Sequence, residues 1–245
     1  MTKEQLYKKF AKYYDQIYEK MDHVKECEFI EWAVNQHQNC DGNKLLDVAC
    51  GTGRHADLLK NRFKIVGVDL NPEMLKIAQN KVLDVEFTEG DMKTLDLKEE
   101  FDVIICMFSA MNYNTTLDEL KATLKNFYNH LYEGGILIFD LGINQENWIE
   151  GLVSVDTVVD EKFKLARICQ SHLEEGIFNA NFVFLIKEDG KVDFDIDQHK
   201  LGVFPIEDVI NLMGKTGFEN FIYTDFTQKN WDVLSGDRPV FVGVK

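Results

Sequence analysis

The sequence is poor in basic residues and rich in acidic ones. Its 245 residues include 27 lysines and arginines against 42 aspartates and glutamates, which gives a formal net charge of −15. A protein that grips nucleic acid needs a basic footprint to neutralise phosphates, and an anionic membrane surface attracts basic segments for the same reason. We therefore expect neither a nucleic-acid partner nor a membrane partner.

Other absences narrow the class of protein further. Only 3 prolines are present, so no proline-rich linker is expected, and no apolar run approaches the roughly 18 residues that span a bilayer. The first residues are polar, so we expect no secretory signal. The 5 cysteines are widely spaced without a CxxC pair, which predicts neither a disulfide framework nor a zinc site. We expect a cytoplasmic protein without a metal.

What the sequence does contain is an alternation of strands and helices. Short apolar segments predict strands at 44–49, 64–69, 85–88, 101–108 and 136–141, and helical patterns lie at 54–61, 72–81 and 117–131. Strands this apolar, separated by helices, indicate a parallel sheet covered on both faces. Before them, residues 2–39 have helical periodicity and predict two helices.

The chain changes character after residue 141. Segments 153–159, 162–172, 177–188 and 191–200 predict strands joined by tight turns, hence an antiparallel meander. A helix at 205–216 and strands at 219–225 and 239–245 then return to the main sheet. We expect an α/β fold with a Rossmann-like, doubly wound, mostly parallel seven-stranded sheet and an antiparallel β insertion. The expected domain limits are 1–141, 142–203 and 204–245.

The strongest local signal is a glycine turn between the first strand and its helix. Gly51, Gly53 and Ala56 lie where a helix begins at the carboxyl edge of an open sheet, the usual ligand site of such folds. Glycine lets the backbone approach a ligand closely. The spacing alone also fits a dinucleotide-binding fingerprint.

Three carboxylates favour a cationic ligand at this turn. Asp47 precedes the turn, Asp69 ends the second strand and Asp91 follows the third, so all three should project from one edge of the sheet. Asp47 would repel the pyrophosphate of a dinucleotide, whereas S-adenosylmethionine carries a sulfonium, an ammonium and a single carboxylate. Asp69 is placed to accept from both ribose hydroxyls. Asp91 can accept from the adenine amino group, with the Met92 amide serving a ring nitrogen.

The successive motifs resemble those of the class I S-adenosylmethionine-dependent methyltransferases. The runs that carry this resemblance are LLDVACGTGRHA, GVDLNPEML, EGDM, FDVIICMFSAMNY and LYEGGILIFD, within residues 44–141. Ala49 stands where the family often has glycine, and we expect that the backbone there need not be left-handed. The further pieces GLVSVDTVV, LARICQSHLEEG, HKLGVF and RPVFVGV resemble the N-methyltransferases of nucleotide-linked deoxyaminosugars, in which the meander caps the active site and holds the nucleotide sugar.

The resemblance and the three carboxylates together suggest roles for single residues. The expected cofactor-binding residues are Asp47, Ala49, Cys50, Gly51, Gly53, Asp69, Leu70, Asp91, Met92 and Met107. The resemblance implies catalytic positions at Tyr14, Tyr113 and His199, and substrate contacts from Tyr7, Arg167, Lys200 and Arg238. The three basic side chains of that set would face a pyrophosphate. Residues 141–148 replace the family's tryptophan-rich stretch.

We therefore expect an S-adenosylmethionine-dependent methyltransferase that acts on a small molecule, with the amino group of a nucleotide-linked aminosugar as the leading acceptor. A nucleobase-amine methyltransferase would carry an Asn-Pro-Pro-Tyr-like loop where Ser109–Tyr113 lies, which disfavours a nucleic-acid acceptor. A dinucleotide-dependent oxidoreductase and a non-catalytic S-adenosylmethionine-binding protein remain alternatives. A homodimer is left open.

Other polar residues have simpler structural explanations. His23 lies in a polar stretch and should be at the surface, and His130 should lie at a helix end. Asp193, Asp195 and Asp197 alternate along a strand, which puts all three on one face. Because the spacing matches no calcium loop, it predicts a solvated strand face rather than a metal site.

Overall fold

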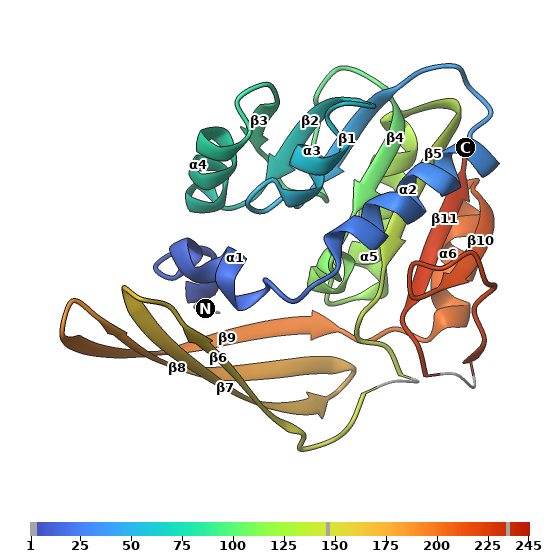
Figure 1. Cartoon of the computed structure of the whole chain (residues 1–245). Coiled ribbons are helices and arrows are strands. Elements are labelled where there is room, and N and C mark those ends of the chain that lie inside the picture. The colour runs from blue at the N-terminus through green and yellow to red at the C-terminus, as the bar shows by residue number, and fades with distance from the viewer. Residues whose placement is uncertain (1–3, 146–147, 234–235) are drawn as a thin grey trace. The chain divides into compact units, whose positions relative to one another are not determined.

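The computed structural model describes residues 4–145, 148–233 and 236–245. The chain forms two compact units, one from Asp22–Trp148 with Phe204–Lys245 and the other from the segment ending at Met21 with Ile149–Val203. Figure 1 shows the elements of both. No helix in the described part of the chain has the length and apolar character needed to cross a membrane. The expected domain limits at 141 and 203 stay a prediction.

A seven-stranded sheet forms the centre of the larger unit. Its strands are β1 Lys44–Val48, β2 Lys64–Asp69, β3 Glu86–Glu89, β4 Phe101–Cys106, β5 Leu131–Asp140, β10 Glu219–Thr224 and β11 Pro239–Val244, in the order β10-β11-β5-β4-β1-β2-β3. Strands β1 to β5 pair in parallel, and β11 pairs antiparallel with both β5 and β10. The predicted doubly wound, mostly parallel sheet is confirmed.

Helices cover both faces of this sheet. They are α2 His23–His37, α3 Arg54–Leu59, α4 Pro72–Lys81, α5 Leu117–Asn129 and α6 Ile206–Thr216, with the short helix η3 Ala110–Tyr113 after β4. Successive strand residues point to opposite faces: Leu45 packs with the apolar residues of α2, α3 and α4, whereas Leu46 packs with those of α5 and α6. Every residue of β4 is buried, which explains the apolar run that begins at Val103.

The smaller unit contains the antiparallel meander. Its strands are β6 Val153–Val159, β7 Phe163–Glu174, β8 Ile177–Glu188 and β9 Lys191–Gly202, paired in that order. The short helices η1 Gln5–Tyr7, η2 Ala11–Tyr13 and α1 Tyr14–Ile17 pack on one face. There, Phe10 and Tyr13 join the buried cluster of Phe184 and Phe163. The predicted meander is confirmed.

The segment before residue 22 differs from the predicted helix, because a buried carboxylate binds its backbone. The amides of Gln5 and Leu6 donate to the Asp197 carboxylate at 2.6 and 2.9 Å. The segment forms short helical turns instead of a continuous helix. The prediction of a solvated face is therefore wrong for Asp197, which is fully buried. Lys9 pairs with the two other aspartates of the row, at 2.9 and 3.2 Å.

Candidate active site

The turn between β1 and α3 has three residues in the left-handed region. Gly51 and Gly53 have φ of 56° and 75°, and Ala49 has φ of 58°. The expectation that the backbone at Ala49 need not be left-handed is wrong, because this residue has a positive φ within the turn. The alanine Cβ costs about 1–2 kcal/mol in this conformation. The turn is held by the Cys50 amide, which donates to the Val68 carbonyl at 3.0 Å.

Asp69, at the end of β2, braces the glycine turn. Its carboxylate accepts from the amides of Gly51 at 2.9 Å and Asn71 at 2.8 Å. Burial raises the pKa of Asp69, and these hydrogen bonds oppose the rise. Each carboxylate oxygen can accept a second hydrogen bond, so this arrangement leaves acceptor capacity for a ligand. Sequence reasoning did not anticipate the bracing role.

Asp47, on β1, is a buried carboxylate with an unsatisfied oxygen. Its Oδ2 has no hydrogen-bond partner among the described residues. Burial raises the pKa of Asp47 to about 7, with His55 opposing the rise and Asp69 adding to it. A buried acceptor without a donor is unfavourable, and a cationic donor placed here would relieve that cost.

Asp91 lies beyond β3, which pairs with β2. The carboxyl ends of three adjacent strands thus bring Asp47, Asp69 and Asp91 to one sheet edge, as their spacing predicts. Asp91 Oδ1 accepts from the Lys93 amide at 2.9 Å. Met92 beside it is half-buried.

The remaining predicted cofactor residues differ in exposure. Met107 and Cys50 are buried in the core, whereas the Leu70 side chain is exposed. Met107 and Cys50 could therefore contact a ligand only through a backbone group or the sulfur atom. Leu70, next to Asp69 at the end of β2, is open to solvent and free to contact a ligand with its side chain.

A histidine–carboxylate cluster beside the glycine turn was not predicted from the sequence. Glu26 Oε2, on α2, hydrogen-bonds His23 Nδ1 at 2.9 Å and His55 Nε2, on α3, at 2.8 Å. Burial alone would raise the pKa of Glu26, but the two histidines outweigh it and lower the value to about 2. The surface assignment of His23 is wrong, because this pairing half-buries the ring. No local motif links Glu26 to a residue 29 positions away.

The loop after β4 is held in a strained conformation by a buried aspartate. Phe108 and Ser109 have φ of 59° and 61°. The Ser109 amide donates to Asp140 at 3.0 Å and its hydroxyl donates at 3.1 Å. Arg238 Nη1 lies 3.5 Å from the same carboxylate. Tyr113 lies half-buried at the end of η3 in this loop.

In the smaller unit, Arg167 is enclosed by its partners. Its Nε and Nη2 donate to Asp156 Oδ2 at 2.9 and 2.6 Å, and its Nη1 donates to the Tyr18 hydroxyl at 2.8 Å. The guanidinium also lies 4.9 Å from the centre of the Phe182 ring, a cation–π distance. This side chain is therefore buried and fixed. These hydrogen bonds do not bear on the predicted contact of Arg167 with a pyrophosphate, which stays a prediction.

His199 belongs to an aromatic cluster on the same face of the meander. Its Nε2 hydrogen-bonds Asp197 Oδ2 at 2.9 Å, and its ring meets that of Tyr7 edge to face at 5.4 Å. Tyr14 lies next, 6.1 Å from the Tyr7 ring. The structure thus brings together Tyr7, Tyr14 and His199. Lys200 is exposed on the opposite face of β9, so it is not grouped with His199 or Arg167.

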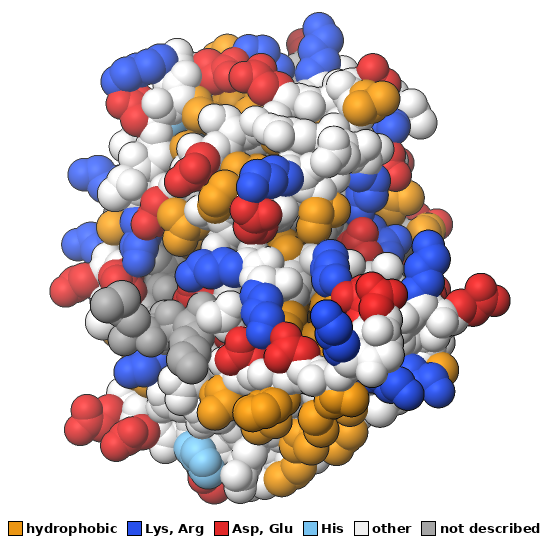
Figure 2. Space-filling view, turned by 90° about the vertical axis from the view of Figure 1, so that its left-hand side faces the viewer, with side chains coloured by type: hydrophobic (Ala, Val, Ile, Leu, Met, Phe, Trp, Pro, Cys, Tyr) orange, Lys and Arg blue, Asp and Glu red, His pale blue; other side chains and the backbone are white. Residues whose placement is uncertain are grey.

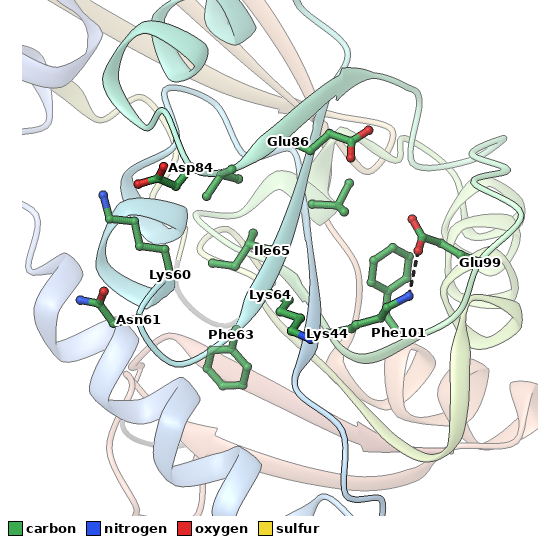
Figure 3. A pocket seen from close by; sticks show the side chains of 12 residues that line it. Lys44, Lys60, Asn61, Phe63, Lys64, Ile65, Asp84, Glu86, Glu99 and Phe101 are labelled. Atoms are coloured by element: carbon green, nitrogen blue, oxygen red, sulfur yellow. Dashed lines mark hydrogen bonds and ion pairs between the residues drawn. The ribbon is translucent and has the colours of Figure 1, made fainter.

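A separate pocket lies at the opposite edge of the large sheet (Figure 3). It is lined by residues at the amino ends of strands β1 to β4, among them Lys44, Lys64, Glu86 and Phe101. Lys44 Nζ pairs across it with Glu99 Oε2 at 3.0 Å. Ligands of open α/β sheets bind at the carboxyl ends of the strands. The pocket is therefore outside the candidate site.

Comparison with known proteins agrees with this geometry. Residues 45–135 match a family model described as a methyltransferase domain. The chain is 31% identical over 166 residues, 67% of its length and 70% of the relative's, to a dTDP-3-amino-3,4,6-trideoxy-alpha-D-glucopyranose N,N-dimethyltransferase of Streptomyces venezuelae.

Two solved structures resemble the whole chain. Streptomyces venezuelae DesVI has a TM-score of 0.85 at 28% identity, with 96% of this chain and 98% of that chain covered. CalS10 from Micromonospora echinaspora, an amino pentose methyltransferase solved with S-adenosylmethionine bound, has a TM-score of 0.78 at 26% identity, with 91% and 92% covered.

The fold, the edge of carboxylates and these similarities define a class I S-adenosylmethionine-dependent methyltransferase, and the chain belongs to that family. Within it, the chain is close to the dTDP-aminosugar N,N-dimethyltransferases. The protein is thus an enzyme whose cofactor is S-adenosylmethionine, and the alternative of an oxidoreductase is set aside.

The residues of the site fit this cofactor. Asp47 supplies an unpaired buried acceptor for a cationic group. The left-handed glycines shape the turn, and a Cβ at Gly53 would come within 3.1 Å of Phe87. A phosphate-bearing dinucleotide would meet the Asp47 carboxylate instead. The donor and acceptor chemistry therefore suits a ligand that carries positive charge.

Proposed function

We propose that the enzyme transfers a methyl group to the amino group of a nucleotide-linked aminosugar. The observation that carries this proposal is the similarity to sugar N-methyltransferases over both compact units, since the match to DesVI covers 96% of this chain. The methyltransferase domain by itself occupies residues 45–135 and would leave the acceptor open. The smaller unit supplies the polar and aromatic groups that an acceptor needs.

In this proposal, carboxylates of the larger unit hold the cofactor. Asp47 pairs with the ammonium, Asp69 accepts from the ribose hydroxyls, and Asp91 accepts from the adenine amino group with the Met92 amide beside it. The other contacts come from Ala49, Cys50, Gly51, Gly53, Leu70 and Met107. The position of three carboxylates at one sheet edge supports this assignment.

The bound cofactor supplies an electrophilic methyl group on a sulfonium. The protein's task is to align an amine with it and to exclude water, so positioning provides most of the rate enhancement. We assign this positioning to Tyr14, Tyr113 and His199. The hydrogen bond from His199 to Asp197 fixes the orientation of the imidazole ring, which a group that receives the amine proton requires.

The acceptor would bring a negatively charged diphosphate to a chain of net charge −15. Local basic groups must therefore offset that charge. We assign this role to Arg167 and Arg238, with Tyr7 contacting the sugar. Lys200, which the sequence predicts to share it, lies on the opposite face of the meander from Arg167. Part of the stretch 141–148 that departs from the family lies outside the described residues, so the sugar is left at the level of its class.

A labelled-methyl transfer assay tests the proposal. Purified enzyme is incubated with radiolabelled S-adenosylmethionine and with dTDP-linked 3-amino and 4-amino deoxysugars, the same sugars without the nucleotide, and glycine. We expect label in the nucleotide-linked amines and at least about tenfold less in the free sugars, because the diphosphate supplies binding energy. Preferential labelling of glycine or of the free sugars would reject the acceptor while leaving the methyltransferase class intact.

We also propose a cytoplasmic location and functional segments at 1–141, 142–203 and 204–245. All 5 cysteines are free thiols, which suits a reducing compartment. Fractionation of cells that express the protein, with thiol labelling of each fraction, tests the location. Recovery of disulfide-bonded protein outside the cytoplasm would contradict it.

A further inference from the structure

Two histidines and one glutamate of the larger unit converge beside the glycine turn. His23 Nδ1, His55 Nε2 and a carboxylate oxygen of Glu26 all lie within 4.8 Å of one another. Among the described residues, this is the one such group of three or more histidine, cysteine or carboxylate side chains. Two imidazoles and one carboxylate are a donor set that proteins use for transition metals. The cluster is therefore a candidate metal site.

The distances within the cluster match those between neighbouring ligands of one metal ion. Glu26 Oε2 lies 2.9 Å from His23 Nδ1 and 2.8 Å from His55 Nε2. A zinc ion bound at about 2.0–2.2 Å by nitrogen and oxygen atoms keeps adjacent ligand atoms roughly 3 Å apart. The glutamate thus already lies at ligand distance from both imidazoles. An ion would replace the protons of these two hydrogen bonds, because metal ligands are deprotonated.

The fold holds these three side chains in place before any ion binds. His23 and Glu26 lie three positions apart on α2, hence on one face of the helix, and His55 lies in the first turn of α3. The two imidazole rings meet edge to face, with centroids 5.3 Å apart. Side-chain exposure is 3% for Glu26, 8% for His55 and 14% for His23. Binding therefore costs little conformational entropy, and His23 marks the side from which an ion enters.

Buried carboxylates of β1 and β5 add negative charge near the cluster. Burial alone would lower the pKa of His55, yet the value is raised. The hydrogen bond to Glu26 and the charges of Asp47 and Asp140 cause the rise. Arg238, 3.5 Å from Asp140, offsets part of that charge. The local field therefore favours a cation at the cluster.

We propose that His23, Glu26 and His55 form a binding site for a divalent transition metal, with zinc as the ion that suits them. Zinc is commonly bound by histidine nitrogen and glutamate oxygen, and two histidines with one glutamate leave a fourth position for water. Magnesium and calcium prefer oxygen ligands, so the two imidazoles disfavour them. The expectation of a protein without a metal rested on cysteine spacing, which does not reveal ligands that come from two separate helices.

The ion would join α2 to α3 next to the glycine turn. Gly53 directly precedes α3, and the His23 ring lies 6.4 Å from the ring of Phe108 in the strained loop after β4. A metal bound here fixes the beginnings of both helices, and with them the turn. Because the methyl group on a sulfonium is already electrophilic, its transfer needs no Lewis acid. The role of the ion is therefore structural, and it does not depend on the identity of the acceptor.

Titration calorimetry of the full-length enzyme, free of any histidine tag and treated with a chelator, tests the proposal with zinc chloride. We expect about one zinc ion per chain with a dissociation constant in the micromolar range or below, and no such binding of magnesium. The melting temperature should rise with zinc, because the ion binds only the folded state. His23→Gln removes the least buried ligand and should weaken zinc binding about a hundredfold, since loss of a group that merely supports a ligand costs roughly 10–100-fold.

Acidic side chains are scattered over the face seen in Figure 2, so weak binding to surface carboxylates must be told apart from the site. His172→Gln is the matched control, because His172 also lies near a glutamate, Glu150, at 3.5 Å but is half exposed. This variant should bind zinc as the wild type does. Cobalt(II) bound to the wild type gives a test that needs no variant, since its visible absorption bands report whether imidazole is among the ligands.

Four results would overturn the proposal. They are a wild type that binds no zinc at about 100 µM, a folded His23→Gln variant that binds zinc as tightly as the wild type, equal weakening in His23→Gln and His172→Gln, and a cobalt spectrum typical of oxygen ligands alone. Far-ultraviolet circular dichroism shows whether each variant is folded.

Discussion

Asp47 and Asp197 are both buried carboxylates, one in each compact unit, and their surroundings differ. Asp197 receives hydrogen bonds from the amides of Gln5 and Leu6 and from His199. Burial alone would raise its pKa, but these partners outweigh burial and lower it. Asp47 has an unpaired oxygen and a pKa of about 7. Both carboxylates are buried, but Asp197 is a structural anion held by protein donors, whereas Asp47 keeps an oxygen open to a ligand.

The largest effect is expected from Asp197→Ala. The change leaves the amides of Gln5 and Leu6 and the His199 ring without their acceptor, and removing one partner of a buried charged network costs about 3–5 kcal/mol. Thermal denaturation should show the loss. Asp193→Ala is the control. Asp193 lies on the same face but is exposed, pairs with Lys9 and accepts from the Phe194 amide, so its loss should leave the melting temperature close to that of the wild type. Equal losses of stability in Asp197→Ala and Asp193→Ala would show that burial and pairing do not set Asp197 apart.

Asp47→Asn should make the cofactor-free enzyme more stable at high pH. The folded pKa of Asp47, about 7, is above the unfolded value, so the folded state binds the extra proton and wild-type stability falls as pH rises from about 4 to above 7. The variant escapes this loss, which is on the order of a few kcal/mol. Its advantage in melting temperature should grow between about pH 5 and pH 8.

The same variant should lose cofactor affinity, because its neutral amide replaces the anion that pairs with the ammonium. Calorimetry with S-adenosylmethionine measures this. In wild type, the affinity should rise as Asp47 ionises, and the variant should lack that part of the pH dependence. A variant that is more stable and binds as tightly would show that Asp47 does not contact the cofactor.

Asp69→Ala should weaken cofactor binding about tenfold, since a charge-assisted contact is worth ~1.5–3 kcal/mol. Asp69 lies between Asp197, whose partners are all in the protein, and Asp47, which has an open oxygen. It accepts hydrogen bonds from the amides of Gly51 and Asn71 and is also predicted to bind the ribose. Calorimetry should therefore be paired with a melting curve of the cofactor-free protein. A lower melting temperature with unchanged affinity would reduce Asp69 to its bracing role.

The smallest effect is expected from Ala49→Gly, which removes the Cβ from a left-handed residue. Relief of strain should stabilise the protein by about 1 kcal/mol, offset in part by the greater freedom of glycine in the unfolded chain. Denaturant titration measures the difference. Ala56→Gly, in helix α3, is the matched control and should be destabilising. Destabilisation of equal size at both positions would contradict the strain at Ala49.

Much of the fold follows from local patterns. Strands β2, β6 and β8 and helix α4 have the predicted limits, because each is a continuous apolar or amphipathic segment bounded by turn residues. The carboxylates at the sheet edge follow from the same logic, since parallel strands end together. The sequence does not predict the contacts of Glu26 with His55 and of Asp197 with Gln5. These hydrogen bonds join residues 29 and 192 positions apart, which only the folded chain brings together.

The hydrogen bonds of Asp197 also set an order of events during synthesis. Gln5 and Leu6 leave the ribosome first, but their acceptor follows 192 and 191 residues later. At roughly 5–20 residues per second, the two amides wait on the order of 10–40 s for this acceptor. The aromatic side chains of this first segment find their partners when β7 and β8 have emerged, and its first backbone amides find theirs only with β9.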